Sequence, residues 1–231
     1  MDETWVNESS PWIDYPLENW KLLTDGRKPV SYKKKCFLYH QEDDAPRAYI
    51  VKSGRVRLTL FSADGTEKQL YIAGPGCLFG EIACIMGLPH TESALCVHDT
   101  QVYQIPQNDL INTMQNNWEI NKRVYNSVFR KNTVYHHQIL ELCFLSCVQR
   151  IAIHLMDLCK RHGVKVKEGY KLDLRFTHSD IASMIHTSRV TVNNTFTWLI
   201  QNNYLIKTGQ TYLIPYEQID RLQQLAEEAP L

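Results

Sequence analysis

The chain has 231 residues, with 25 lysines and arginines balancing 25 aspartates and glutamates, and its pI is about 7.1. This balance excludes a basic surface spread over the whole molecule, and no apolar run is long enough to span a bilayer. The length allows two domains with cores of their own, and the acidic N-terminus lacks a signal-peptide pattern, so we expect a cytoplasmic protein without membrane contact.

Residues 1–106 are predicted to form an N-terminal arm followed by a β-barrel. From about residue 29, short apolar or alternating runs are separated by turn residues such as Asp64-Gly65, a pattern typical of a β-sandwich or jelly-roll barrel. The predicted strands are Cys36–His40, Ala48–Lys52, Val56–Phe61, Lys68–Ile72, Ser93–Val97 and Gln101–Ile105.

Residues 107–145 are predicted to form one long helix. A heptad-like series runs along it, made of Val124, Val128, Lys131, Tyr135, Gln138, Leu142 and Leu145. A long helix with an imperfectly apolar stripe is unstable alone, and a second copy of the chain could cover the stripe as a dimer seam. The alternative is a helix that lies on its own barrel.

Residues 146–231 begin with a helix and lead to a helical hairpin. Ser146 and Gln149 fit a capping box that starts the helix Val148–Arg161, and a short extended stretch follows at Tyr170–Arg175. Two further strands, Tyr204–Thr208 and Thr211–Pro215, flank Gly209-Gln210, and residues 216–228 look like an amphipathic terminal helix.

The stretch Phe176–Ile206 predicts two short helices joined by a tight turn. Thr177 and Asp180 fit a second capping box, and Thr187 or Ser188 can cap the second helix. A short second helix with polar exposed positions is what a helix-turn-helix places in the major groove, and the following hairpin would be its wing. The alternative is a helical hairpin packed in a core.

Charge is distributed in favour of the DNA-binding interpretation. Residues 147–214 contain nine lysines and arginines against four acids, whereas residues 1–146 contain fifteen against seventeen. The modest basic excess therefore lies in the part of the chain that the interpretation requires.

This order of elements resembles the Crp/Fnr superfamily of bacterial transcription regulators over roughly residues 30–214. The resemblance rests on Ser53-Gly54, Asp64-Gly65, Gly74-Pro75-Gly76, Phe79-Gly80-Glu81-Ile82, Ser93-Ala94, Phe144-Leu145, Gln149-Arg150-Ile151-Ala152, Asp180-Ile181-Ala182 and Ser188-Arg189-Val190-Thr191-Val192. It implies an α+β protein with a cupin-like jelly-roll barrel related to cyclic-nucleotide-binding domains (1–106), a long dimerisation helix (107–145) and a winged helix-turn-helix domain (146–231).

The family's effector pocket contains a Gly-Glu pair followed by Arg-Ser-Ala, in which the arginine binds the cyclic phosphate. This chain keeps Gly80-Glu81 and Ser93-Ala94, but Thr91 and Glu92 precede Ser93. A carboxylate repels a phosphate by about 4 kcal/mol at 4 Å and an effective dielectric near 20, so cyclic AMP is not the expected effector. The expected effector-binding residues are Gly80, Glu81, Ile82, Thr91, Glu92, Ser93, Tyr135 and His136.

The resemblance leaves the effector unknown. Seven cysteines show neither a CxxC pair nor zinc-like spacing, and no cysteine cluster near the N-terminus matches the family's iron–sulfur sensors. Haem binding through Cys77, Cys84, His90 or His98 is not expected, because a lone cysteine or histidine is more often structural. A small aromatic ligand that meets Tyr135 and His136 is one possibility, and a role of both residues in the dimer seam is the other.

The predicted DNA-binding residues fall on the helical hairpin. Arg189 can pair with guanine, Val190 can contact a thymine methyl, and Asn193 or Asn194 can pair with adenine, which suggests an A/T-rich half-site. Phosphate contacts are expected mainly from the hydroxyls and the imidazole, and the full set is Thr177, His178, Ser179, Thr187, Ser188, Arg189, Val190, Thr191, Asn193 and Asn194.

The sequence therefore predicts a homodimeric, effector-controlled transcription regulator that binds palindromic double-stranded DNA and works with RNA polymerase. An effector-sensing barrel that regulates a protein partner instead of DNA is the alternative. The sequence contains no catalytic triad, metal-ligand cluster or phosphate-binding loop, so an enzyme is not expected.

Overall fold

The computed structural model describes residues 9–172, 177–209 and 211–227. Contacts divide the chain into two compact units, residues 1–137 and 138–231, and each is described by itself. The predicted positions Arg175, Phe176, Gln210 and Glu228 lie outside the described residues. Within the described residues, no helix is both long enough and apolar enough to cross a bilayer.

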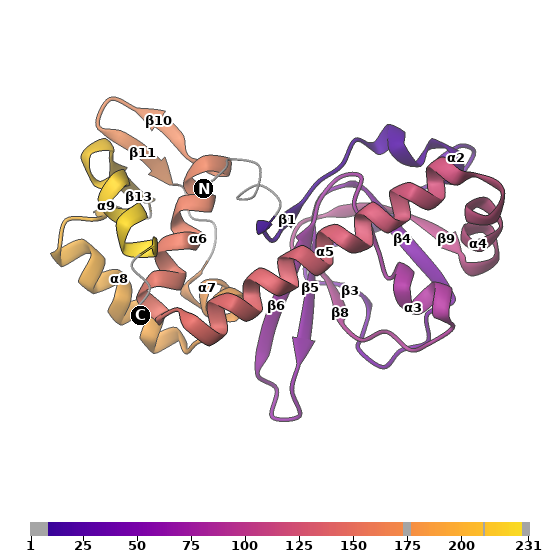
Figure 1. The fold of residues 1–231 in the computed structure, drawn as a ribbon, viewed down its shortest axis with the longest axis horizontal. Coiled ribbons are helices and arrows are strands. Elements are labelled where there is room, and N and C mark those ends of the chain that lie inside the picture. The colour runs from indigo at the N-terminus through magenta and orange to yellow at the C-terminus, as the bar shows by residue number, and fades with distance from the viewer. Residues whose placement is uncertain (1–8, 173–176, 210, 228–231) are drawn as a thin grey trace. The chain divides into compact units, whose positions relative to one another are not determined.

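Two β-sheets form the barrel of the first unit (Figure 1). One sheet has the order β1-β6-β5-β8-β3, with bounds Trp12–Ile13, Glu67–Ala73, Val56–Phe61, Ser93–Cys96 and Phe37–Tyr39. The other has the order β2-β9-β4-β7, with bounds Val30–Tyr32, Thr100–Pro106, Arg47–Ser53 and Leu78–Phe79. The jelly-roll prediction is confirmed, and all six predicted strands are present within a few residues of their expected ends.

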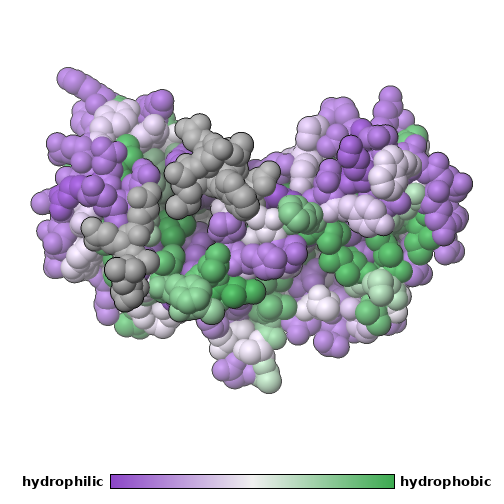
Figure 2. Space-filling model, viewed as in Figure 1, coloured by the Kyte–Doolittle hydropathy of each residue, from purple (hydrophilic) through white to green (hydrophobic). Residues whose placement is uncertain are grey.

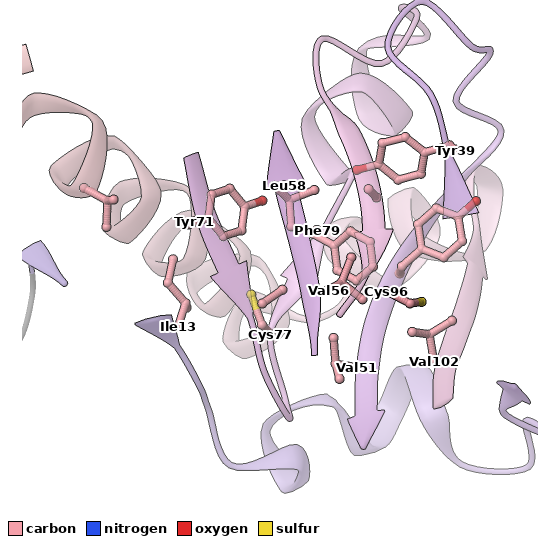
Figure 3. Packing of buried hydrophobic residues seen from close by; sticks show 14 residues of the cluster. Ile13, Tyr39, Val51, Val56, Leu58, Tyr71, Cys77, Phe79, Cys96 and Val102 are labelled. Carbon is pink, nitrogen blue, oxygen red and sulfur yellow. The ribbon is translucent and has the colours of Figure 1, made fainter. Parts of the chain in front are cut away.

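Alternation along the strands fills the space between the two sheets. On β5, Val56 and Leu58 are fully buried, and on the facing strands Val51 and Val102 meet them (Figure 3). Because successive side chains of a strand point to opposite faces, Val51 of β4 packs in this core, whereas its neighbour Ile50 packs in a second core on the other face. The strands β1, β2 and β7 were not predicted, since two or three residues are too few to show the alternation.

The N-terminal arm is part of the barrel. Its strand β1 pairs in parallel with β6, and the 3₁₀ helix η1 (Leu17–Trp20) and helix α2 (Lys21–Thr24) follow. Trp20 is buried and its indole N–H donates to the carbonyl of Gly76 at 2.6 Å. Gly76 has a φ of 73°, and a Cβ there would lie 1.9 Å from the Tyr15 carbonyl oxygen, so this turn requires glycine.

Three helices accompany the barrel: α3 (Glu81–Met86), α4 (Gln107–Asn116) and α5 (Trp118–Phe144). The predicted single helix over 107–145 is therefore wrong at one point, because the backbone of Asn117 is extended, with φ −142° and ψ 104°. The Asn117 side chain accepts a hydrogen bond from the amide of Ile120 and so caps the start of α5.

Helix α5 turns the predicted stripe toward its own barrel. Val124 and Lys131, two members of the series, are 1% and 3% exposed. For this face the alternative of a helix lying on its barrel is the correct one. Trp118, Tyr125 and Phe129 lie on the opposite side of the helix and are 66%, 58% and 69% exposed. Leu142 of the predicted series lies in the second unit and is 39% exposed.

The second unit contains helices α6 (Cys147–His162), α7 (His178–Ile185), α8 (Arg189–Gln201) and α9 (Tyr216–Glu227). A four-stranded sheet of order β10-β11-β13-β12 accompanies them, with bounds Val164–Val166, Gly169–Leu172, Thr211–Pro215 and Ile206–Thr208. The capping box of α6 is confirmed, because Ser146 accepts from the Gln149 amide and the Gln149 side chain accepts from the Ser146 amide. Strand β10 was not predicted.

Candidate functional site

Helix α7 begins at the capping box that the sequence predicts and ends at a left-handed histidine. Thr177 accepts a hydrogen bond from the Asp180 amide, and the Asp180 carboxylate accepts from the Thr177 amide at 2.8 Å. The capping box is therefore confirmed. At the other end, His186 is left-handed with a φ of 53°, so the turn between the two helices is made at a position that few residues other than glycine adopt.

Helix α8 is capped by Ser188, the second of the two predicted candidates. Its side chain accepts from the Thr191 amide at 3.0 Å. Val192, Phe196 and Leu199 are buried, at 0%, 1% and 0%, so one side of α8 is fixed against the unit's core. The orientation of the other side follows from this packing.

The exposed side of α8, here called the reading face, consists of Arg189, Val190, Asn193, Asn194 and Thr197. Val190 is 68% exposed although it is apolar, and no described side chain covers it. An exposed aliphatic residue beside a guanidinium and two amides is an arrangement that fits the edges of bases in a major groove.

Thr197 is the member of the reading face that sequence reasoning missed. Its hydroxyl donates to the carbonyl of Asn193 at 2.9 Å, one turn earlier. The signal was available, because Thr197 lies four residues after Asn193 and residues at that spacing share one face of a helix.

The predicted phosphate contacts divide into exposed and engaged side chains. Thr177, Ser179 and Ser188 are exposed at the N-terminal ends of α7 and α8, where free amides favour an anion. His178 and Thr187 are only partly exposed.

His178 is the clearest departure among the predicted phosphate contacts. Its ring lies 4.9 Å from the Phe196 ring, and its Nε2 lies 3.4 Å from the Tyr212 hydroxyl. Burial lowers the pKa of His178, and the positive charges of Lys207 and Arg189 lower it further. A histidine held neutral in this way supports the fold of the helical hairpin more than it binds phosphate.

Thr191 and Thr187 are partly covered and bonded within the unit. The Thr191 hydroxyl lies 2.8 Å from the Ser188 hydroxyl, and the Thr187 hydroxyl lies 3.6 Å from Cys147 Sγ. The hairpin of β12 and β13 follows α8, and Lys207 on β12 is exposed. This hairpin occupies the position of the predicted wing.

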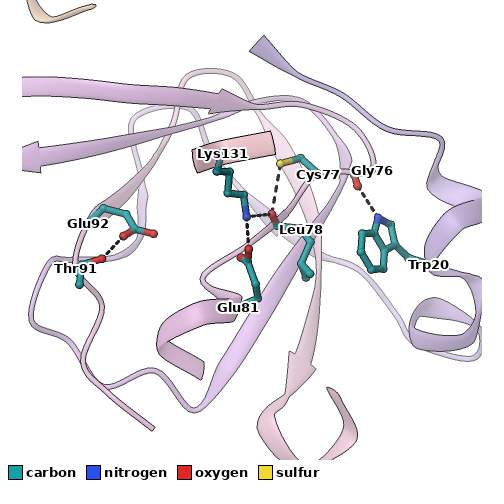
Figure 4. A network of polar contacts seen from close by, with 8 residues as sticks. All are labelled: Trp20, Gly76, Cys77, Leu78, Glu81, Thr91, Glu92 and Lys131. Atoms are coloured by element: carbon teal, nitrogen blue, oxygen red, sulfur yellow. Dashed lines mark hydrogen bonds and ion pairs between the residues drawn. The ribbon is translucent and has the colours of Figure 1, made fainter. Parts of the chain in front are cut away.

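A second candidate site lies inside the barrel, where α3 meets α5. Gly80, with a φ of 70°, precedes α3 and lets Glu81 point inward. The Lys131 ammonium forms an ion pair with Glu81 and donates to the Leu78 carbonyl at 2.7 Å (Figure 4). The side chains of Lys131 and Glu81 are 3% and 2% exposed, so this is a buried ion pair that joins two helices.

Glu92 faces the same region. Its carboxylate accepts a hydrogen bond from the Thr91 hydroxyl at 2.6 Å and is directed toward the side where Lys131 and Glu81 meet (Figure 4). Burial raises the pKa of Glu92, while the Thr91 hydrogen bond and the charge of Lys131 act in the opposite direction. Ser93 is buried and its hydroxyl accepts from the Gln41 amide at 2.9 Å, so it serves the barrel wall.

Three tyrosines surround these charged groups: Tyr39, Tyr71 and Tyr135. The Tyr71 ring lies 5.7 Å from the Lys131 ammonium and 6.3 Å from the Tyr135 ring. Burial raises the pKa of each phenol, and the negative charges of Glu92 and Glu81 raise it further. We call Glu81, Lys131, Glu92, Tyr39, Tyr71 and Tyr135 the barrel cluster.

Two predicted effector residues lie elsewhere. His136 is exposed on the outer side of α5, opposite the buried face that contains Lys131, and Ile82 is 51% exposed on α3. The barrel cluster does include Tyr135, Glu81 and Glu92 as predicted. The sequence places Lys131 in the helix stripe and Tyr39 and Tyr71 in strands, because periodicity does not report contacts across the barrel.

The cysteines and histidines near the barrel cluster are core residues. Burial raises the pKa of the Cys77 thiol to about 12 and lowers the pKa of His90 to about 4. His90 stacks on Tyr39 with ring centroids 3.5 Å apart. Among the described residues, no group of three or more His, Cys, Asp or Glu side chains is placed to hold a metal ion.

Comparison with known families assigns both units. Residues 29–117 match the cyclic nucleotide-binding domain family, and residues 149–225 match the Crp-like helix-turn-helix domain family. The first match includes the barrel from β2 to β9 with α3 and α4, and the second includes α7, α8 and the wing.

Relatives of similar length match along most of the chain. A CRP-like cAMP-activated global transcriptional regulator from Mycobacterium tuberculosis is 24% identical over 192 residues, which cover 83% of this chain and 86% of that protein. The structure of a CooA variant from Carboxydothermus hydrogenoformans matches with a TM-score of 0.72 at 22% identity, covering 91% and 89%. The c-di-GMP responsive regulator CLP from Xanthomonas campestris matches with a TM-score of 0.73 at 18% identity, covering 87% and 99%. These structural likenesses show a common fold.

Proposed function

This chain belongs to the Crp/Fnr superfamily of DNA-binding transcription regulators, and from that premise we propose that it acts as a homodimer controlled by a small effector other than cyclic AMP. Its relatives are transcription regulators, so its function is regulatory and not enzymatic.

The reading face is the observation that supports this function most strongly. A capped α8 presents one guanidinium, two amides and an uncovered valine on a single side, while its other side is locked in the core. Bidentate contacts by arginine and asparagine discriminate among base pairs by about 1–3 kcal/mol each. Val190 adds a preference for thymine, which supports an A/T-rich half-site.

The exposed stripe of α5 supports a dimer. Trp118, Tyr125, Phe129, His136 and Leu140 follow one another at spacings of four or seven residues, and all are exposed. Figure 2 shows hydrophobic side chains on the face of the molecule across which α5 runs. A run of exposed aromatic and aliphatic side chains at heptad spacing is typical of a helix that pairs with a second copy.

The barrel cluster supports an effector other than cyclic AMP. Glu92 lies where the family's pocket has arginine, and its carboxylate points inward, so it opposes a phosphate. Lys131 cannot replace the arginine, because its ammonium is already bound by Glu81 and the Leu78 carbonyl. Effectors already differ among the relatives, since one is named for cAMP and another for c-di-GMP.

Control by the effector is expected to pass through the ion pair between α3 and α5. Glu81 begins α3 and Lys131 lies in the middle of α5, so a ligand that changes their contact changes how α5 is held. A ligand shifts the equilibrium between two conformations only by binding one of them more tightly than the other. The conformation with the ion pair intact and one with it changed would bind a ligand beside Glu81 and Lys131 with different affinities. We expect RNA polymerase as a further partner and the cytoplasm as the place of action.

Selection from random duplexes, followed by gel shift, tests the function. The wild type should enrich a palindrome, and Arg189→Ala should lose about 1–3 kcal/mol of discrimination for each guanine contacted. Lys52→Ala, an exposed change on β4, is the matched control. Failure to enrich any palindrome, with indifference to DNA at low salt, would instead favour a barrel that regulates a protein partner.

A further inference from the structure

The barrel cluster contains one more carboxylate than ammonium. Lys131 and Glu81 neutralise each other, whereas Glu92 receives a hydrogen bond from Thr91 and has no lysine, arginine or histidine within ion-pair distance among the described residues. A half-buried carboxylate without a counter-ion is unfavourable, because its charge is removed from water without compensation. The raised pKa of Glu92 has burial as its main cause and agrees with this geometry.

Tyr39 adds a polar group at the same place. Its side chain is 5% exposed, and its hydroxyl has no partner in full hydrogen-bond geometry among the described residues, although it faces Glu92 closely enough to lower the pKa of that carboxyl. The hydroxyl lies 3.4 Å from the point where Gly80 would have a Cβ, so it is directed at the start of α3 beside Glu81. Buried hydroxyls are normally satisfied, and one that is not indicates a place for a further partner.

Three of the six residues of the barrel cluster are aromatic. Tyr39 lies 6.3 Å from Phe79, and Tyr71 lies 6.3 Å from Tyr135, measured between ring centroids. The face of an aromatic ring attracts a cation, and several rings beside a carboxylate form the kind of cage that holds alkylammonium groups. The Lys131 ammonium over Tyr71 already uses one such face.

We propose that the barrel cluster binds a small organic cation of the alkylamine class, with Glu92 as its counter-ion and the rings and hydroxyls of Tyr39, Tyr71 and Tyr135 around it. This inference rests on the proposed function, because it names the class of effector for the same barrel. An ammonium neutralises Glu92, and its N–H groups reach the Tyr39 hydroxyl. An anion finds no free positive group there, since the Lys131 ammonium contacts Glu81, the Leu78 carbonyl and the Tyr71 ring.

Binding is measured on the full chain without DNA, so that the result is independent of DNA recognition. The probes are the chloride salts of n-butylammonium, phenethylammonium and tetramethylammonium, with sodium phenylacetate, neutral phenethyl alcohol and cyclic AMP as the contrasting ligands. Calorimetry and thermal unfolding at constant ionic strength give the affinity and the shift in Tm. We expect saturable binding of at least one ammonium compound, and a weaker or absent response to the anions and the alcohol.

Two variants locate the bound cation. Glu92→Gln should lower the affinity by about tenfold or more, and Tyr39→Phe should lower it by a smaller factor, since it removes one hydroxyl and keeps the ring. Glu119→Gln is the matched charge control, because Glu119 is exposed about 18 Å from Lys131 along α5. If Glu92→Gln were to lose its folded circular dichroism spectrum, Tyr39→Phe would serve as the deciding variant.

Three results would overturn the inference. The first is that no ammonium probe raises Tm above the value measured in sodium chloride alone. The others are that an ammonium probe binds Glu92→Gln as tightly as the wild type, or that an anionic probe binds more tightly than every ammonium probe. If a palindrome is still enriched in the DNA selection, only the ligand class is wrong. If no palindrome is enriched and an ammonium probe binds with the expected loss in Glu92→Gln, the binding site stands and the DNA function fails.

Discussion

Replacing Lys131 by methionine leaves the Glu81 carboxylate inside the barrel without its counter-ion. The two side chains are 3% and 2% exposed, so water does not reach the freed carboxylate. Removing one partner of a buried pair typically costs about 3–5 kcal/mol, because the remaining charge is uncompensated. Methionine keeps the length and much of the volume of lysine, so the loss reports the charge and not a cavity. The Leu78 carbonyl also loses its donor.

The double variant Lys131→Met with Glu81→Met separates charge from packing. When both members of a buried pair become apolar, the change is often neutral or stabilising. The double variant should therefore regain most of the loss, which gives a coupling energy of a few kcal/mol between the two sites.

Urea unfolding at one fixed chain concentration gives the free energy of unfolding for each variant. Far-ultraviolet circular dichroism follows both units, and the barrel contributes buried Trp12 and Trp20 to the change in tryptophan fluorescence. Lys52→Met, on the exposed side of β4, removes an ammonium from the surface and should stay within about 0.5 kcal/mol of the wild type. A loss below about 1 kcal/mol for Lys131→Met, or a double variant no more stable than the single one, would refute the assignment of a buried ion pair between α3 and α5.

Two further changes test the seam of α5 and the charge of Glu92. Phe129→Glu places a carboxylate on the exposed stripe and should raise the dimer dissociation constant by about 30-fold or more in sedimentation equilibrium. The control Gln115→Glu on α4 should leave this constant unchanged. A Phe129→Glu chain that dimerises as tightly as the wild type would exclude this face as the seam. Because burial raises the folded-state pKa of Glu92, its ionisation lowers stability as pH rises through that pKa. Glu92→Gln should therefore have a higher Tm than the wild type at pH 7–8, and the difference in Tm between the two should shrink as pH falls toward 4.5. A difference in Tm that does not change with pH would contradict this.

Local signals allowed the sequence to locate the helical hairpin. Thr177 and Asp180 form the capping box they were expected to form, and Ser188 caps the next helix, because caps depend only on neighbours three residues away. Six strands of the barrel were predictable for the same reason, since alternation is a property of adjacent residues, whereas β1, β2 and β7 are too short to show it.

Long-range contacts limited the prediction of α5 and of the barrel site. Lys131 was placed in an apolar series, and its partner Glu81 lies 50 residues away, so periodicity could not show that a buried ion pair turns this face inward. The same holds for Tyr39 and Tyr71, which come from different strands and meet only when the barrel closes. Two polar members of that series, Lys131 and Gln138, were the available sign that this face meets polar groups.

The stoichiometry and spacing of the DNA complex test the proposal of a dimeric regulator most directly. Native mass spectrometry of the protein with its selected palindrome should give two chains per duplex, with half-site centres about one helical turn, or 34 Å, apart. Inserting five base pairs between the half-sites moves one of them to the opposite side of the duplex, and the affinity should fall by about tenfold or more. One chain per duplex, or an affinity that does not change with the insertion, would contradict the account.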